Sequence, residues 1–274
     1  MTMKKFLRNA QMFVGAGIVL FFVLVGIFAS VLATHDPLEV VIARRLQAPS
    51  SEHFFGTDDL GRDNFSRVVY GARISLIVGV TATLGGAVVG VVFGIVSAYF
   101  GGKLDTVIMR IMDVMLAFPG ILLGLVVVTV LGASLHGIII TIAILNIPTF
   151  ARIVRGSTLS VKKLEYIDAI RAVGARDSRI IFVHILPNIL SPIIVQATLS
   201  VGTAIVAAAA FSFLGIGIPA PTPEWGAMVD RGRGFIAQAP HMIYYPGAMI
   251  FFFVVGINLF GDGLRDYLEP KKHR

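Results

Sequence analysis

Six long apolar runs constrain this chain more than any other feature, because about 20 apolar residues are enough to cross a hydrocarbon core as one helix. Of the 274 residues, 56% are hydrophobic and only 14% are charged, whereas roughly 25% are charged in an ordinary soluble domain. We therefore expect an all-α polytopic membrane protein with six transmembrane helices. The predicted spans are Met12 to Ala33, Ile74 to Ala98, Val114 to Leu131, Leu135 to Phe150, Ile189 to Ala210 and Tyr245 to Phe260.

The first run has a second interpretation as a cleaved secretory signal peptide. Lys4, Lys5 and Arg8 precede it, and Val31-Leu32-Ala33 resembles a small-residue cleavage site. Its apolar stretch is longer than the roughly 7 to 15 residues of a signal core. We expect the run to remain as a membrane span.

Positive charges are divided unevenly between the segments that connect the spans. If the N-terminus is cytoplasmic, sixteen of the 23 Lys and Arg residues fall in inner segments, and the positive-inside rule favours this orientation. Both termini are then expected in the cytoplasm. The net charge of +7 needs no nucleic acid partner, because an anionic inner leaflet attracts basic segments.

Several kinds of chemistry have no residues to support them. The cores of the six runs contain no Asp, Glu, Lys or Arg, which argues against a proton relay and so against an ion-coupled carrier working alone. The nearest approach to a phosphate-binding loop, Gly101-Gly102-Lys103-Leu104, lacks the first glycine and the hydroxyl residue. We expect no catalytic residue, no ATP hydrolysis and no cofactor bound by this chain.

Metal binding is not expected either. The chain has no cysteine, which excludes disulfides and thiolate metal sites. Its six histidines include no pair at the spacing of helical zinc ligands.

One charged segment between two apolar runs, DAIRAVGARDSRIIFVHILPN, begins at Asp168. On a helix, Ile167, Ala169, Ile170, Val173 and Gly174 share one face, while Asp168 and Arg171 point away. We expect Gly174 to end this helix in the left-handed conformation. Asp177 or Ser178 is then expected to cap a second helix, and Pro187 to enter the fifth span in its first turn.

The apolar face of this short helix has three possible neighbours: lipid, the rest of the chain, or a groove on a partner. Helices that rest on lipid favour large side chains such as Trp, Phe and Leu. Here the small residues Ala169, Ala172, Gly174 and Ala175 favour a close protein contact.

This segment resembles the cytoplasmic loop of importer permeases of the ATP-binding-cassette class. Their signature is Glu-Ala-Ala, three residues, Gly, nine residues, then Ile, any residue and Leu-Pro. Here the positions read Asp168-Ala169-Ile170, Gly174 and His184-Ile185-Leu186-Pro187, with the same spacing. Asp for Glu, Ile for the second Ala and His for Ile resemble the peptide and nickel branch of the family.

Two further stretches extend the resemblance to C-type subunits of dipeptide, oligopeptide and nickel permeases. FGTDDLGRDNFSRVVYGARISLIVG, from Phe55 to Gly79, is similar to the segment that precedes their second span. FSFLGIGIPAPTPEWGAMVDRGR from Phe211 and NLFGDGLRDYLEP from Asn258 are similar to their last external loop and C-terminal end.

The resemblance implies a type I importer permease core of the MetI-like kind. It implies residues 1–72 as an N-terminal cytoplasmic tail, first span and external loop, and 73–263 as a core of five spans with a cytoplasmic coupling loop at 151–187. Residues 264–274 would be a cytoplasmic tail. The implied location is the inner membrane of a bacterium or archaeon.

The resemblance also implies the partners. These are a homologous B-type permease, two ATP-binding subunits that carry ATP and Mg, and a solute-binding protein outside the membrane. The implied cargo is a short peptide, with nickel or another metal chelate as the alternative in the same family. A structural membrane scaffold is a possibility from a different function class, and the coupling-loop motif argues against it. The residues implied to dock the ATPase are Glu165, Asp168, Ala169, Ile170, Ala172, Gly174, Ala175 and Pro187.

Two polar groups fall in the expected external loops. Asp58, Asp59, Arg62 and Asp63 form a Gly-flanked cluster. It either contacts the solute-binding protein, helps to gate the external mouth, or only caps a turn before the second span. Glu224 and Trp225 follow two prolines in the other loop. Both are candidates to contact the solute-binding protein or to form part of an external gate, although Trp225 is more typical of an interfacial anchor.

Within the spans, small residues and prolines predict local packing. Gly85, Gly86, Gly90 and Gly94 form a track at near-helical spacing, which favours close approach of another helix. Pro119 and Pro148 interrupt the third and fourth spans and are expected to permit bending.

Overall fold

The computed structural model describes residues 3–268, and side chains from Ala10 onward. The side chains of Lys4, Lys5 and Arg8 therefore lie outside the description. So do Glu269 and Pro270 of the C-terminal motif and the basic residues Lys271, Lys272 and Arg274.

Helices form most of the described chain, and residues 3–268 contain no strand apart from an isolated bridge between Thr57 and Asp63. The α-helices are α1 (Met3–Ile27), α2 (Ala29–Leu32), α3 (Asn64–Phe100), α4 (Gly102–Ala117), α5 (Gly120–Leu131), α6 (Leu135–Lys162), α7 (Glu165–Ala172), α8 (Asp177–Arg179), α9 (Leu190–Phe213), α10 (Trp225–Gly232) and α11 (His241–Leu268). A π-helix covers Ile180–Ile185, and 3-10 turns cover Ile42–Arg44, Leu186–Ile189 and Arg233–Phe235.

Five helical stretches within residues 3–268 are long and apolar enough to cross a membrane: α1, α3, α6, the stretch from Asp177 to Phe213, and α11. α4 and α5 meet the same criteria only together, and they are bent by 98° at the break between them. The all-α membrane class is confirmed. The count of six holds when α4 and α5 are taken as one broken span.

The third predicted span, Val114 to Leu131, is bent at Pro119, where the sequence predicted an interruption. Proline lacks the amide hydrogen and disfavours helical backbone in the residue before it. Accordingly Phe118 is extended (φ −83°, ψ 138°) and Pro119 separates α4 from α5. Hydrophobic counting also missed most of α4, because this helix carries four charged residues.

Other predicted spans differ from the observed helices mainly at their ends. The fourth continues beyond Phe150 to Lys162, with Pro148 inside the helix, so the loop that follows starts later than the predicted position 151. The first is interrupted at Phe28, between α1 and α2. α3 begins at Asn64, so the expected division at 72–73 falls inside a continuous helix.

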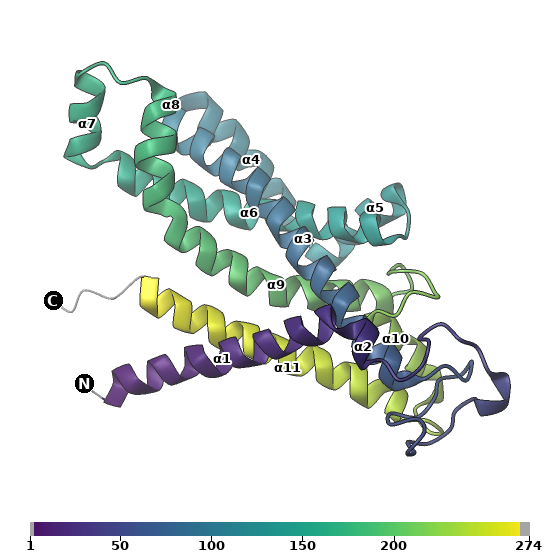
Figure 1. The fold of residues 1–274 in the computed structure, drawn as a ribbon. Helices are drawn as coiled ribbons and strands as arrows, with labels where there is room; N and C mark the ends of the chain where they lie inside the picture. The colour runs from purple at the N-terminus through teal and green to yellow at the C-terminus, as the bar shows by residue number, and fades with distance from the viewer. Residues whose placement is uncertain (1–2, 269–274) are drawn as a thin grey trace.

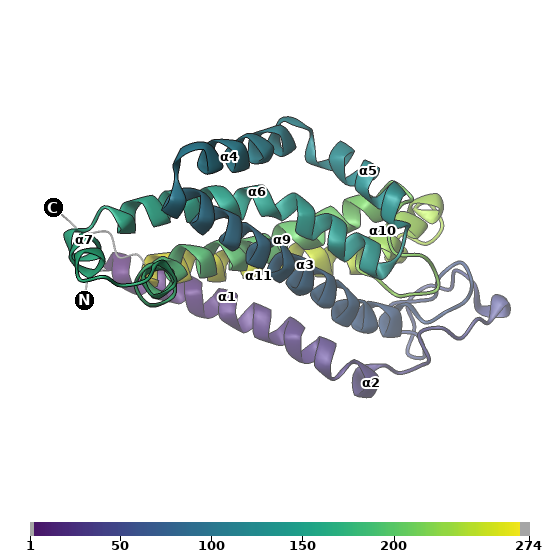
Figure 2. The ribbon, with the colours of Figure 1, turned by 90° about the horizontal axis from the view of Figure 1, so that it is seen from above.

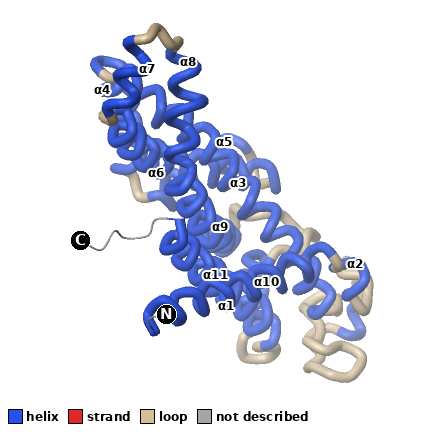
Figure 3. Tube along the Cα trace, turned by 60° about the vertical axis from the view of Figure 1, so that its left-hand side comes forward, coloured by secondary structure: helices blue, strands red, loops and turns tan. Residues whose placement is uncertain are grey.

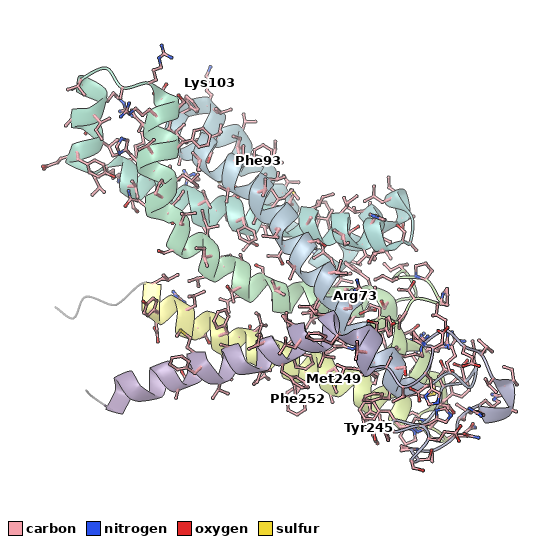
Figure 4. All side chains as sticks on the ribbon, in the orientation of Figure 1. Arg73, Phe93, Lys103, Tyr245, Met249 and Phe252 are labelled. Carbon is pink, nitrogen blue, oxygen red and sulfur yellow. The ribbon has the colours of Figure 1, made fainter. Side chains whose placement is uncertain are left out.

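The long helices extend between two ends of the molecule, and α1 and α11 diverge from α3, α6 and α9 toward the end that carries α7 (Figures 1 and 2). The start of α1, the end of α11 and the α7–α8 segment lie toward one end. The loops next to α2 and α10 lie at the other end, where Figure 3 shows long tan stretches. Lys103 lies at the α7 end and Arg73 toward the opposite end (Figure 4).

The predicted small-residue track on α3 is confirmed as a packing surface for α6. A Cβ atom at Gly90 would lie 2.5 Å from the Cβ of Phe150, and one at Gly94 would lie 2.7 Å from the carbonyl oxygen of Ala151. These distances leave no space for a side chain. The two helices approach so closely because glycine lines the contact.

We expect Gly90→Ala to destabilise the protein, because the added methyl group forces α3 and α6 apart. Overpacking of this kind costs about 1–3 kcal/mol, which should appear as a lower thermal unfolding temperature in detergent. Gly17→Ala is the matched control, since nothing lies within 4 Å of a Cβ at Gly17 in α1. Equal unfolding temperatures for the two variants would contradict this account of the helix contact.

The first span packs into the core. Phe22 of α1 is 3% exposed and contacts Trp225 and Phe253 edge to face, with ring centroids 5.7 and 5.5 Å apart. Edge-to-face contacts are a preferred arrangement of aromatic rings. The apolar run whose second interpretation is a signal peptide thus contributes to a core shared with α10 and α11.

Candidate functional site

The segment between α6 and α9 projects at one end of the molecule, where α7 is visible in Figure 1. Four isoleucines fix it to the helices behind it. They are Ile167, Ile180, Ile185 and Ile189, each 0% exposed, and they pack with Ile95, Tyr99 and Val154 of α3 and α6. Because these side chains are fully buried, the segment is packed firmly against α3 and α6 and is not a free loop. We call α3, α6 and this segment the α3–α6 body.

Polar contacts reinforce this attachment at the end of α3. The Tyr99 hydroxyl donates a hydrogen bond of 2.6 Å to Asp177 Oδ1. Lys162 Nζ donates to the Tyr99 carbonyl at 2.6 Å, where a cation also compensates the negative helix end. Asp177 or Ser178 was predicted to cap the second helix, and this is wrong: the α8 N-cap is Arg176, with no side-chain cap.

The amphipathic face of α7 is divided differently from the prediction. Ile167 is buried and Ile170 is half-buried against the body, whereas Ala169 and Val173 are exposed, Val173 to 85%. Arg171, predicted to point away, reaches back to Tyr99, its guanidinium 5.8 Å from the ring centroid. A hydrogen bond with Tyr99 raises the pKa of Arg171.

Gly174 ends α7 as predicted. Its φ is +84°, a conformation that side-chain-bearing residues rarely adopt. The Gly174 amide donates to the Arg171 carbonyl and the Ala175 amide to the Ile170 carbonyl, which is the bonding pattern of a Schellman motif. A Cβ at Gly174 would have nothing within 4 Å, so this turn lies open at the surface.

The remaining predicted docking residues are mostly exposed. Glu165, Asp168, Ala172 and Pro187 are exposed and Ala175 is half-buried. Pro187 lies in the 3-10 turn before α9 rather than in its first turn. Together with Ala169 and Gly174, Ala172 forms an exposed patch of small residues, which we call the α7 patch.

Tyr99→Phe is expected to loosen this segment without unfolding the helices. The variant loses the bond to Asp177, and a hydrogen bond to a charged group contributes about 1.5–3 kcal/mol. Amides of residues 176–181 should exchange hydrogen faster, while those in the middle of α3 should not change. Unchanged exchange at 176–181 would show that the isoleucine cluster alone holds the segment.

Charged side chains fill the interior at the opposite end. Asp58 and Arg62, 3% and 1% exposed, pair through Arg62 Nε and Asp58 Oδ2 at 2.7 Å. Asp63 caps α3 by accepting a hydrogen bond from the Ser66 amide at 2.8 Å. The cluster therefore forms a capped turn before the second span, and burial leaves Asp58, Arg62 and Asp63 little surface for another protein.

Asp59 is the member of this cluster that links the two loops. Arg231 in α10 donates to both of its carboxylate oxygens, at 2.6 and 3.0 Å. The hydrogen bond to Asp59 raises the pKa of Arg231, which favours the charged guanidinium. A bidentate pair of this kind holds the two side chains in a defined orientation in addition to the attraction between their charges.

Glu224 is the most deeply buried acid of this region, at 0% exposure. It caps α10 by accepting from the amides of Gly226 and Ala227, both at 2.8 Å. The Ser212 hydroxyl donates to it at 3.0 Å and the Ser75 hydroxyl at 3.4 Å. The carboxylate therefore joins α3, α9 and α10.

Trp225 is not an interfacial anchor, which corrects the prediction. Its side chain is 0% exposed, and its indole Nε1 donates a 2.9 Å hydrogen bond to the Val68 carbonyl. A Cβ at Gly71 would lie 2.7 Å from the indole ring, so α3 provides a glycine where the ring is seated. Sequence reasoning missed this role because one tryptophan beside prolines resembles a membrane-surface residue.

An apolar groove of about 820 Å³ lies along α3, α9 and the π-helix. Val88, Phe182 and Ile194 are among its lining side chains, and Thr83 and Thr198 are its polar ones. None of the described residues that line it is ionisable.

Two family models match this chain. One describes binding-protein-dependent transport system inner membrane components and matches residues 90–274. The other describes the N-terminal transmembrane domain of oligopeptide transport permease C and matches residues 1–49.

Curated relatives match the chain over nearly its whole length. A dipeptide transport system permease protein of Alkalihalophilus pseudofirmus is 50% identical over 268 residues, 98% of this chain and 88% of that protein. A glutathione transport system permease protein of Shigella dysenteriae serotype 1 is 46% identical over 269 residues, 98% of this chain and 89% of that protein.

The fold also has a solved counterpart. A chain of the MetNI methionine ABC transporter, in inward facing conformations, superimposes with a TM-score of 0.62 at 20% identity and covers 74% of this chain and 96% of that one. This similarity confirms the expected fold class.

Proposed function

Because the chain belongs to the family of binding-protein-dependent transport system inner membrane components, we propose that it is the permease subunit of an ATP-driven importer that moves short peptides into the cytoplasm. The match to the dipeptide permease, at 50% identity over 98% of the chain, supports the cargo. The oligopeptide permease C model at the N-terminus supports the C-type position in the complex. Both favour peptides over the alternative of nickel or another metal chelate.

The single observation that carries the mechanism is the α7 patch: an exposed row of small residues on a helix that is itself fixed to the body. A groove on a partner can approach Ala169, Ala172 and Gly174 closely, while Ile167 and Ile180 beneath them are fully buried. We assign this surface to one ATP-binding subunit. A homologous B-type permease and a second ATP-binding subunit complete the proposed inner assembly.

Rigid attachment allows the patch to transmit movement. ATP drives a switch between conformations only if it binds them with different affinity, so the docked segment has to move together with the spans. The bond from Tyr99 to Asp177 and the isoleucine cluster connect α7 to α3 and α6. Closure of the ATP-binding subunits would then rotate these helices as one body.

Orientation follows from the same assignment. The α7 end, with the start of α1 and the end of α11, faces the cytoplasm of a bacterial or archaeal inner membrane. The opposite end faces outward, where the loops joined by Asp59 and Arg231 form the surface that receives a peptide-loaded solute-binding protein. Lys103 at the α7 end supports this direction, since cytoplasmic segments are rich in Lys and Arg.

Affinity purification from the native membrane tests this composition. A tagged chain in mild detergent should bring down a second permease, ATP-binding subunits and a solute-binding protein, with peptides identified by mass spectrometry of the bound small molecules. A metal chelate in place of peptides would show that the cargo is the alternative one, nickel or another chelated metal. Recovery of the chain alone, with uptake intact, would contradict the proposal.

A further inference from the structure

Two histidines and a glutamate lie close together in the loops at the α2 end, although one of them is well separated from the other two in the sequence. His35 follows α2, whereas Glu52 and His53 lie in the loop before α3. One ligand atom from each residue lies within 4.8 Å of the other two. The rings of His35 and His53 are 4.7 Å apart between centroids.

His53 is the residue that points to a ligand. Its side chain is buried, with the residue 3% exposed, and Nδ1 lies 2.8 Å from Asp63 Oδ1. Its Nε2 is also buried and has no hydrogen-bond partner among the described residues. Buried polar nitrogens nearly always have a partner, so this atom requires an explanation.

The contact with Asp63 suits metal ligation. A carboxylate beside Nδ1 holds the proton there and leaves the Nε2 lone pair free, which is the arrangement that orients metal-binding histidines in proteins. Asp63 is itself held at the N-cap of α3 by the Ser66 amide. His53 is therefore oriented by a carboxylate that is fixed in turn.

We propose that His35, Glu52 and His53 bind one divalent transition-metal ion, with Zn²⁺ as the ion of matching chemistry. Two imidazoles and one carboxylate form a ligand set typical of zinc, with a fourth position open to water. Ligand atoms of tetrahedral zinc are about 3.3 Å apart, so the three groups close inward when the ion binds.

The outermost ligand is free to make this movement. The Glu52 side chain is 60% exposed and pairs across the surface with Arg44, at 3.1 Å. Exposed pairs of this kind are weak, so a metal ion can take the carboxylate from Arg44. Bound metal would join the end of α2 to the start of α3 through His35 and His53. The inference concerns this loop and does not depend on which cargo the protein carries.

The test uses the purified full-length chain, carrying an affinity tag without histidine. Zn²⁺ content and affinity are measured for the unaltered chain, His35→Gln, Glu52→Gln and the control His136→Gln, which removes an exposed histidine from α6. The unaltered chain and the control should bind one Zn²⁺ each. The other two variants should bind at least about tenfold more weakly.

Thermal unfolding in the presence of a chelator checks the fold of all four proteins, and His35 and Glu52 are chosen because neither is fully buried. Co²⁺ in place of Zn²⁺ should give the visible absorption of a tetrahedral site in the unaltered chain and the control only. Absence of Zn²⁺ binding by the unaltered chain would overturn the proposal. So would affinity that is the same in all four folded proteins.

Discussion

Ala172→Trp is expected to lower ATP-driven uptake at least about tenfold, a loss that corresponds to about 1.4 kcal/mol, while the protein still accumulates in the membrane. Ala172 is exposed on α7, so the indole collides with nothing inside the chain. In the proposed complex it occupies the space into which the ATP-binding subunit fits. ATP hydrolysis should then no longer respond to the loaded solute-binding protein.

Ala172→Ser is the matched control, because it keeps a small side chain at the same helical position. Position 172 is also a cleaner test than Gly174, where φ is +84° and any side chain strains the turn. For Gly174→Trp we expect the same loss of uptake and of ATPase stimulation, with insertion unchanged. Normal uptake by an Ala172→Trp variant that inserts well into the membrane would contradict the assignment of the α7 patch as the surface that binds the ATP-binding subunit.

Glu224→Ala is expected to destabilise the protein by about 3–5 kcal/mol and to reduce its level in the membrane. Loss of a helix cap costs up to about 2 kcal/mol, and each buried donor left without a partner costs about 1–3 kcal/mol. The variant removes the acceptor for the Gly226 and Ala227 amides and for the Ser212 hydroxyl.

Glu39→Ala is the control for this experiment, since Glu39 is an exposed acid in the other loop at the same end. Thermal unfolding in detergent should separate the two variants clearly. If Glu224→Ala unfolds at the temperature of the control, the buried carboxylate does not hold α3, α9 and α10 together.

Much of the fold could be predicted from apolar runs, because each long run has to be a helix when its backbone is in lipid. The third span shows the limit of that reasoning. α4 is helical through Lys103 and Asp105, yet its charges hide it from a count of apolar residues, and Pro119 then turns the chain by 98°. Pro119 predicts where the helix breaks, but the angle between α4 and α5 could not be predicted from the sequence.

The candidate site divides in the same way. Gly174 could be predicted to end α7 because its place after an amphipathic helix is a local signal. The partners of Trp225 and Asp177 could not, because Val68 and Tyr99 are 157 and 78 residues away in sequence. His35 and His53 also meet only in three dimensions, through a loop that has no helical or strand periodicity.

Uptake of a labelled dipeptide into proteoliposomes tests the central claim most directly. The vesicles would contain the chain alone or together with its co-purified permease and ATP-binding subunits, with the solute-binding protein outside and ATP inside or absent. We predict uptake only by the full assembly with ATP, and its loss with Ala172→Trp. Peptide uptake by the chain alone without ATP, driven by an ion gradient, would contradict the assignment of this protein as a permease subunit of an ATP-driven importer.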